Sequence, residues 1–119
     1  MALHDLKIVD STLREGEQFA RAHFTKAQKR EIALSLDAFG VEYIELTNPS
    51  ASPCSFDDAR MIAGLGLRAR VLVHCRCTME DARRAVATGA HGVNVLFGTS
   101  QQLREHSHGR SVEQIIAAA

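Results

Sequence analysis

Charged and polar residues gather around a glycine at residues 10–18, directly after a short apolar run, in the order Asp-Ser-Thr-Leu-Arg-Glu-Gly-Glu-Gln. The Arg14 guanidinium can hold a carboxylate in a bidentate grip, and the Glu15 carboxylate beside it can bind a hard divalent cation through oxygen. This pairing suits an α-keto acid chelated to a metal. A solvated turn before a capped helix has the same composition, so the cluster by itself leaves both interpretations open.

Four strand-and-helix units must position these residues. Thr25 and Gln28 have the spacing of a helix capping box, and Gly40 stands where a left-handed residue ends a helix. Similar start and stop signals recur along the chain. We predict strands at residues 6–10, 41–47, 69–74 and 92–97. One helix starts at Ser55 with Asp58 and ends at Gly64 or Gly66, and the next starts at Thr78 with Asp81 and ends at Gly89. A last helix starts at Ser111 with Gln114, before the terminal run 115–119.

Strands that alternate with helices through short, glycine-bearing turns predict a parallel sheet with right-handed crossovers. A complete TIM (β/α)8 barrel has about 250 residues, so a chain of 119 residues supplies a (βα)4 half. We therefore expect an α/β fold with one domain, residues 1–119, in which homodimerisation completes the barrel. A flavodoxin-like open α/β sandwich with helices on both faces is the alternative.

Polar residues occur at the predicted carboxyl ends of the strands, where the loops of parallel sheets build sites. Asp10 ends the first strand, Glu45 and Thr47 lie at the end of the second, His74 ends the third, and Asn94 lies within the fourth. We expect these side chains to converge at one edge of the sheet. A buried carboxylate such as Glu45 needs a partner or a function.

Several ordered segments resemble the homocitrate synthase and isopropylmalate synthase family: DSTLREGEQF at residues 10–19, FGVEYIELT at 39–47, LGLRARVLVHCRC at 65–77, LFGTS at 96–100 and SHGR at 107–110. The Glu that follows Arg14 is more similar to homocitrate synthase. The resemblance implies the amino-terminal half of a TIM barrel that uses a divalent metal (Mg, Mn or Zn) to condense acetyl-CoA with 2-oxoglutarate in lysine biosynthesis.

The resemblance also implies roles for single residues. Arg14 would clamp the keto acid and activate it as an electrophile, and Glu15 would bind the metal. Glu45 would act in catalysis, whereas Gln18 and His74 would line the substrate pocket. Thr47 would bind substrate as well. For His74 and Thr47, a structural role at the strand end remains the alternative.

Two departures from the family weigh against activity of this sequence alone. Asn94 stands where the family has an acidic residue, which removes a charge from the pocket. The family's metal-binding His-x-His pair follows a later strand, whereas His106-Ser107-His108 lies in a loop that matches the ordinary SHGR segment. With one carboxylate ligand and no acetyl-CoA site, we expect weak or absent metal binding and poor condensation.

Three functional hypotheses follow. The first is a half-barrel that is not a competent acyltransferase alone but binds a metal, or a 2-oxo acid or another carboxylate or anion, at Arg14 and Glu15. The second is one part of a split acyltransferase that a complementary barrel half completes. The third is a self-assembling, non-catalytic module. An open four-stranded sheet has edges that attract partners, so we expect a homo-oligomer, with a dimer favoured.

Bulk composition narrows the partners. Lys and Arg together number 14, as do Asp and Glu, so the formal net charge is zero, which argues against nucleic acid and membrane surfaces as partners. No apolar run reaches the roughly 20 residues of a spanning helix, and the start lacks a secretory pattern, so we expect a cytoplasmic protein. The sparse cysteines Cys54, Cys75 and Cys77 are interpreted as free thiols.

Overall fold

The computed structural model describes residues 5–119, in which four parallel strands form one open sheet in the order β1-β2-β3-β4. The strands are β1 (Val9–Asp10), β2 (Tyr43–Leu46), β3 (Arg70–Arg76) and β4 (Gly92–Leu96). Each pair of neighbouring strands is parallel, and in the register Val9 lies opposite Tyr43, Tyr43 opposite Arg70, and His74 opposite Asn94. The predicted parallel sheet is confirmed, although β1 is much shorter than the predicted strand 6–10.

Helices follow the strands at positions that their caps dictate. Helix α1 (Lys26–Phe39) starts with the predicted capping box of Thr25 and Gln28 and ends at Gly40, whose φ of 100° is left-handed. Helix α2 (Pro53–Ala63) begins earlier than predicted, because Ser52 rather than Ser55 is its N-cap and proline occupies the first turn. Helix α3 (Met79–Ala87) is capped by the Thr78 side chain, as predicted.

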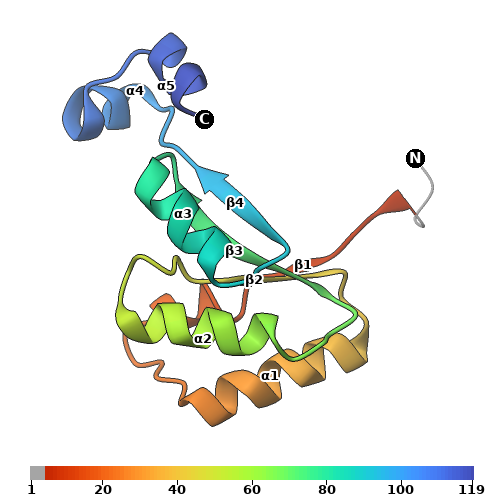
Figure 1. Ribbon diagram of the computed structural model, residues 1–119. Coiled ribbons are helices and arrows are strands. Elements are labelled where there is room, and N and C mark those ends of the chain that lie inside the picture. Colours follow the sequence, from red (N-terminus) through yellow and green to blue (C-terminus); the bar gives the residue numbers. More distant parts are fainter. Residues whose placement is uncertain (1–4) are drawn as a thin grey trace.

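The hydrophobic core lies between these three helices and one face of the sheet. Ile44 and Val73 are fully buried on this outer face, against Ala33 of α1 and Ile62 of α2. Each such aliphatic side chain contributes roughly 1.5–3 kcal/mol by burial. Because α1, α2 and α3 all contribute to one core on one side, the opposite, inner face of the sheet is left without helices from residues 5–119 (Figure 1).

The fourth unit differs from the first three. A short helix α4 (Gln101–Leu103), a π-turn η3 (Arg104–His108) and α5 (Val112–Ala118) lie beyond the carboxyl end of β4, away from α1 and α2 (Figure 1). The predicted polar loop thus contains helical turns, whereas the predicted capping box of Ser111 and Gln114 is confirmed. Val93 and Val95, on the outer face of β4, stay exposed.

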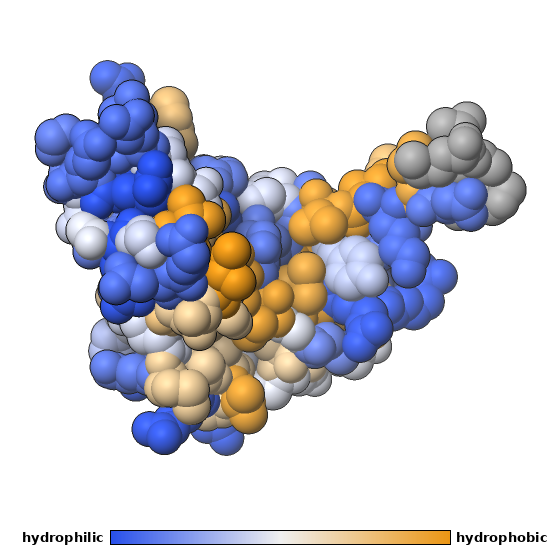
Figure 2. All heavy atoms as spheres, turned by 90° about the horizontal axis from the view of Figure 1, so that it is seen from above, coloured by the Kyte–Doolittle hydropathy of each residue, from blue (hydrophilic) through white to orange (hydrophobic). Residues whose placement is uncertain are grey.

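The inner face is hollowed and partly apolar. Figure 2 shows a stripe of hydrophobic side chains crossing it from the amino-terminal segment toward the middle of the molecule. Val9 and Leu96 occupy inner-face positions by register and are exposed. Sequential strand order with helices on one face is the arrangement of a half TIM barrel rather than of the flavodoxin-like alternative, whose sheet is covered on both faces.

Candidate functional site

The loop after β1 is a tight turn built by its own side chains. The Asp10 carboxylate accepts hydrogen bonds from the Thr12 amide at 2.9 Å and from the Thr12 hydroxyl at 3.2 Å. The Ser11 carbonyl accepts the Arg14 amide at 3.1 Å. Leu13 is buried in the core, which anchors the turn. These contacts fix the backbone from which Arg14 projects.

Glu45 is the centre of the cluster on the inner face. Its side chain comes from β2, and the residue is only 4% exposed. The Ser11 hydroxyl donates to one carboxylate oxygen at 2.8 Å, and the Asn94 amide donates to the other at 2.6 Å. Arg14 Nε lies 3.0 Å from that second oxygen, although its N–H is not aligned for a hydrogen bond. Residues from the loop after β1, from β2 and from β4 therefore meet at one carboxylate.

These contacts set the charge of Glu45. Burial by itself would raise the pKa of the carboxyl, but the hydrogen bonds from Ser11 and Asn94, together with the Arg14 guanidinium, lower its pKa below the ordinary value. Glu45 is consequently ionised at neutral pH. With both oxygens occupied, this carboxylate orients the guanidinium and is poorly placed to accept a further proton.

Arg14 and His74 carry the groups that a ligand can use. The Arg14 side chain is 15% exposed and pairs with the neighbouring Glu15 as well as with Glu45. His74 lies on β3 beside them, and its buried Nε2 has no hydrogen-bond partner among residues 5–119. Burial and the positive charge of Arg14 lower the pKa of His74, so the ring is neutral at pH 7. An unpaired imidazole nitrogen beside a guanidinium can accept or donate one hydrogen bond to a bound acid.

Glu15 is the candidate metal ligand, and its surroundings do not complete a metal site. Its side chain is 59% exposed and its described contact is with Arg14. Among residues 5–119, no three His, Cys, Asp or Glu side chains are grouped so that they could hold an ion. A hard cation takes about six oxygen ligands, so this chain's described residues offer one donor and do not fit a complete site.

The pair His106 and His108 does not supply the missing ligands. His108 Nε2 lies 2.8 Å from the Gly98 carbonyl, and its ring packs edge-on against Phe97. His106 is exposed, 4.0 Å from Glu105. Both residues belong to η3, beyond the end of β4, where His108 contacts Gly98 and Phe97.

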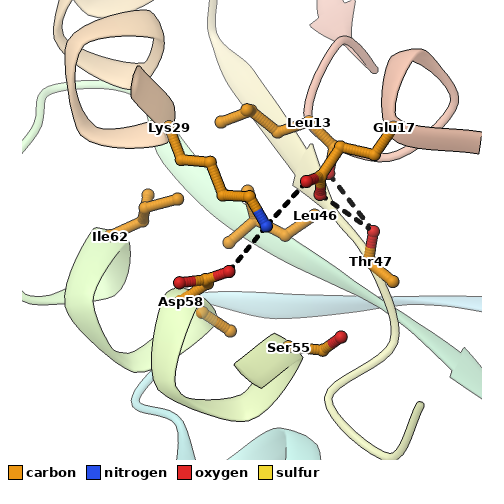
Figure 3. A pocket seen from close by; sticks show the side chains of 9 residues that line it. Leu13, Glu17, Lys29, Leu46, Thr47, Ser55, Asp58 and Ile62 are labelled. Carbon is orange, nitrogen blue, oxygen red and sulfur yellow. Dashed lines mark hydrogen bonds and ion pairs between the residues drawn. The ribbon is translucent and has the colours of Figure 1, made fainter. Parts of the chain in front are cut away.

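Gln18 and Thr47, both predicted to bind substrate, lie apart from the Glu45 cluster. Gln18 ends the turn η2 (Gly16–Gln18), where its side chain is exposed and takes no part in the cluster's hydrogen bonds. The Thr47 hydroxyl donates to the Leu13 carbonyl at 3.3 Å and lies 3.5 Å from the Glu17 carboxylate. Thr47 therefore faces a second, small pocket beneath the loop (Figure 3).

Sequence reasoning missed several polar contacts. Ser11 was inside the quoted motif, but nothing in its spacing indicated that it would bind Glu45. Asp81, noted as a helix-start residue, is buried and accepts the Arg76 guanidinium in a bidentate pair at 2.8 and 2.9 Å and the Asn48 amide at 2.7 Å. The Arg76 hydrogen bonds hold the pKa of Asp81 far below its ordinary value.

A sequence model of the HMGL-like family matches residues 5–119. The chain belongs to the HMGL-like family. Within it, the chain is 58% identical over 113 residues to the mitochondrial homocitrate synthase of Penicillium rubens, covering 95% of this chain and 24% of that protein. It is 52% identical over 117 residues to the cytosolic isozyme of homocitrate synthase of Saccharomyces cerevisiae, covering 98% of this chain and 27% of that protein. The homocitrate synthase of Pyrococcus abyssi is 39% identical over 94 residues, which cover 79% of this chain and 26% of that protein.

This HMGL-like chain spans about a quarter of the length of the curated relatives that it matches, and corresponds to their amino-terminal part. The similarity to homocitrate synthase that the motifs indicated is thereby confirmed. Within residues 5–119, no helix combines the length and the apolar character needed to cross a bilayer. All three cysteines are free, as the sequence indicated.

Proposed function

We propose that this chain forms the oxo-acid half of a homocitrate synthase-like site, in which Arg14 binds the carboxylate of a 2-oxo acid such as 2-oxoglutarate. One observation carries the proposal: the guanidinium of Arg14 pairs with the buried carboxylate of Glu45 and lies beside His74, whose Nε2 has no hydrogen-bond partner among residues 5–119. An oriented guanidinium forms two parallel hydrogen bonds with a carboxylate, which gives both affinity and direction.

Each residue then has a definite task. Glu45 stays ionised and fixes the orientation of Arg14, so that binding a ligand does not require the guanidinium to be ordered first. The neutral His74 offers one hydrogen bond to the keto oxygen or to the second carboxylate oxygen. Arg14, by placing positive charge near the keto carbon, makes that carbon more electrophilic.

Glu15 would be one ligand if a divalent cation took part. Because the other described residues do not complete a coordination sphere, further ligands would have to come from outside the described residues or from the oxo acid itself. Acetyl-CoA binding and acyl transfer require groups that this site does not contain. The chain alone is therefore proposed to bind the acid without condensing it, and a complementary barrel half would convert it into one part of a split acyltransferase.

Homodimerisation is the second route to completion. The open edge of β4 and the apolar part of the inner face support it, since eight parallel strands from two copies offer a closed barrel. Light scattering after size-exclusion chromatography would give a mass of twice 13.0 kDa if this proposal holds. A monomeric mass across the concentration range would overturn it. A self-assembling module without ligand binding is the competing function.

Titration with 2-oxoglutarate, followed by the NMR shifts of the His74 ring and the Arg14 side chain, tests the binding proposal. Wild type is expected to bind in the millimolar range or tighter, and Arg14→Ala to lose binding. Saturation that persists in Arg14→Ala would remove the basis of the site. Arg21→Ala, on the exposed segment after η2, is the matched control for loss of one positive charge.

We also propose a cytoplasmic location, which the similarity to the cytosolic isozyme of Saccharomyces cerevisiae supports; a mitochondrial location, as described for the relative from Penicillium rubens, is the competing one. Fractionation of cells that express the chain with a carboxyl-terminal tag distinguishes the two compartments.

A further inference from the structure

Beneath the Arg14 loop, Lys29 joins three elements through two carboxylates. Its Nζ lies 2.6 Å from Glu17 of η2 and 2.6 Å from Asp58 of α2, while the residue itself belongs to α1. The Lys29 side chain is 14% exposed. Figure 3 shows the ammonium reaching between the two carboxylates.

The charge of Lys29 matters because the two carboxylates face each other across a small space. Burial alone would lower the pKa of Lys29, but the hydrogen bonds that its ammonium donates to Asp58 and Glu17 raise that pKa, so the ammonium is charged throughout the physiological range. The cavity of about 20 Å³ that these residues line has room for roughly one water. Loss of the ammonium would leave two partly buried carboxylates opposed with little solvent between them.

Glu17 connects this ion pair to the ligand-binding loop. Arg14 stands between two fixed points: Leu13, buried in the core, and Glu17, held by Lys29. The Leu13 carbonyl also accepts the Thr47 hydroxyl, which ties the same turn to the end of β2. Releasing Glu17 from Lys29 would remove the ion pair that holds the segment after Arg14 to α1.

We propose that Lys29 is a positioning residue for the Arg14 site, acting through Glu17 on the conformation of residues 14–18. The ligand named in the test rests on the proposed function, whereas the effect on loop order does not depend on any ligand. The two carboxylates have different tasks. The Glu17 contact restrains the loop, and the Asp58 contact holds α1 to α2, so only the first affects ligand affinity.

Four variants separate these tasks: Lys29→Met, Glu17→Gln, Asp58→Asn and, as a matched control, Lys26→Met, which removes an exposed lysine from the first turn of the same helix. Amide hydrogen exchange at residues 14–18, compared with Ile44 in the core, reports loop order. NMR titration with 2-oxoglutarate, at a temperature where each variant is folded, reports affinity.

Lys29→Met and Glu17→Gln are each expected to weaken 2-oxoglutarate binding about tenfold, the size of one lost charge-assisted hydrogen bond, and to speed exchange at residues 14–18 relative to Ile44. Asp58→Asn is expected to lower thermal stability while affinity stays within about twofold of wild type. Lys26→Met should change neither property. Glu17→Gln keeps the Lys29–Asp58 pair, so it decides the question if Lys29→Met does not fold.

Unchanged loop exchange in Glu17→Gln and Lys29→Met would overturn the proposal, as would loop exchange that rises only in proportion to global unfolding. Equal losses of affinity in Asp58→Asn and Glu17→Gln would also overturn it, because they would show a general structural effect. If wild type fails to bind 2-oxoglutarate, the proposed function is wrong, and the exchange data alone decide the role of Lys29: faster exchange supports it and unchanged exchange refutes it.

Discussion

Replacing Asn94 with aspartate tests whether buried Glu45 is held ionised by hydrogen-bond donors. In the native protein, the Asn94 amide donates to the Glu45 carboxylate at 2.6 Å. The Asn94→Asp substitution removes that donor, which costs about 1.5–3 kcal/mol for a hydrogen bond to a charged group. It also sets two negative charges together, with a repulsion of at most about 4 kcal/mol at 4 Å and an effective dielectric constant of 20.

Solvent reduces the repulsion between the two carboxylates. The Asn94 side chain is exposed, so a carboxylate at that position can turn partly toward water. We therefore expect Asn94→Asp to destabilise the fold by about 2–4 kcal/mol at pH 8. At pH 5 the two carboxyls can share a proton, and the protonated one can donate to the other in place of the amide, so the cost should fall to roughly 1 kcal/mol.

The pH dependence has opposite signs in the two proteins. In wild type the pKa of Glu45 is lowered on folding, so its contribution to stability is present above the ordinary pKa of a glutamate and is lost as pH falls through the folded value. In Asn94→Asp the coupled pair takes up a proton more readily, so stability is lost as pH rises. Urea unfolding followed by circular dichroism between pH 5 and 8 measures both trends.

Asn94→Ala provides the control, because it removes the donor without adding a charge. It should be destabilised to a similar extent at pH 5 and pH 8. A free energy of unfolding for Asn94→Asp that does not fall between pH 5 and 8, relative to Asn94→Ala, would refute the assignment of Glu45 as a buried, ionised carboxylate.

Three further predictions follow from the contacts. Arg14→Lys keeps the charge but loses the planar fork, so 2-oxoglutarate affinity should fall about tenfold by NMR titration, whereas Arg21→Lys should have no effect. Asp81→Asn should lower the free energy of unfolding in urea by about 2–4 kcal/mol at pH 7, because the Arg76 pair is broken in a buried site, and should flatten the wild-type loss of stability as pH falls below about 4. Thr25→Ala should lower the free energy of unfolding by about 1 kcal/mol in the same assay, because α1 loses its N-cap. Thr99→Ala, which replaces a threonine that caps no helix, is the control.

Much of the fold was predictable because local signals and tertiary structure agree. The capping boxes at Thr25 and Ser111 start helices where predicted, since the side chain and backbone satisfy each other without outside help. The predicted start of α2 at Ser55 was wrong. Ser52, Pro53 and Ser55 are all residues that favour a helix start, and the helix begins with Pro53 in its first turn and Ser52 as its N-cap. The short β1 was also missed, because strand length depends on the partner strand and not on propensity alone.

The site was predictable only in part. Strand parity brought Glu45, His74 and Asn94 to one face, as expected for polar residues near the carboxyl ends of parallel strands. Thr47 was expected with them, but β2 ends at Leu46, and the Thr47 hydroxyl lies against the Leu13 carbonyl and the Glu17 carboxylate instead. The contacts of Lys29 and Asp81 depend on how helices pack over the sheet, which no motif of the sequence specifies.

The exposure of β4 constrains any partner that completes the barrel. Backbone pairing along its free edge would satisfy the strand's hydrogen-bonding groups but would leave Val93 and Val95 exposed on the outer face, because α5 does not cover them. Completion therefore requires more than an added strand: either α5 must swing onto β4, as the other helices pack on β2 and β3, or the partner must bring a helix to that face. In a homodimer with the present positions of α4 and α5, both copies would keep these valines in water, so a dimer that buries them must also rearrange residues 97–111. Protection of the Val93 and Val95 methyl groups from a soluble paramagnetic probe on association reports this rearrangement directly.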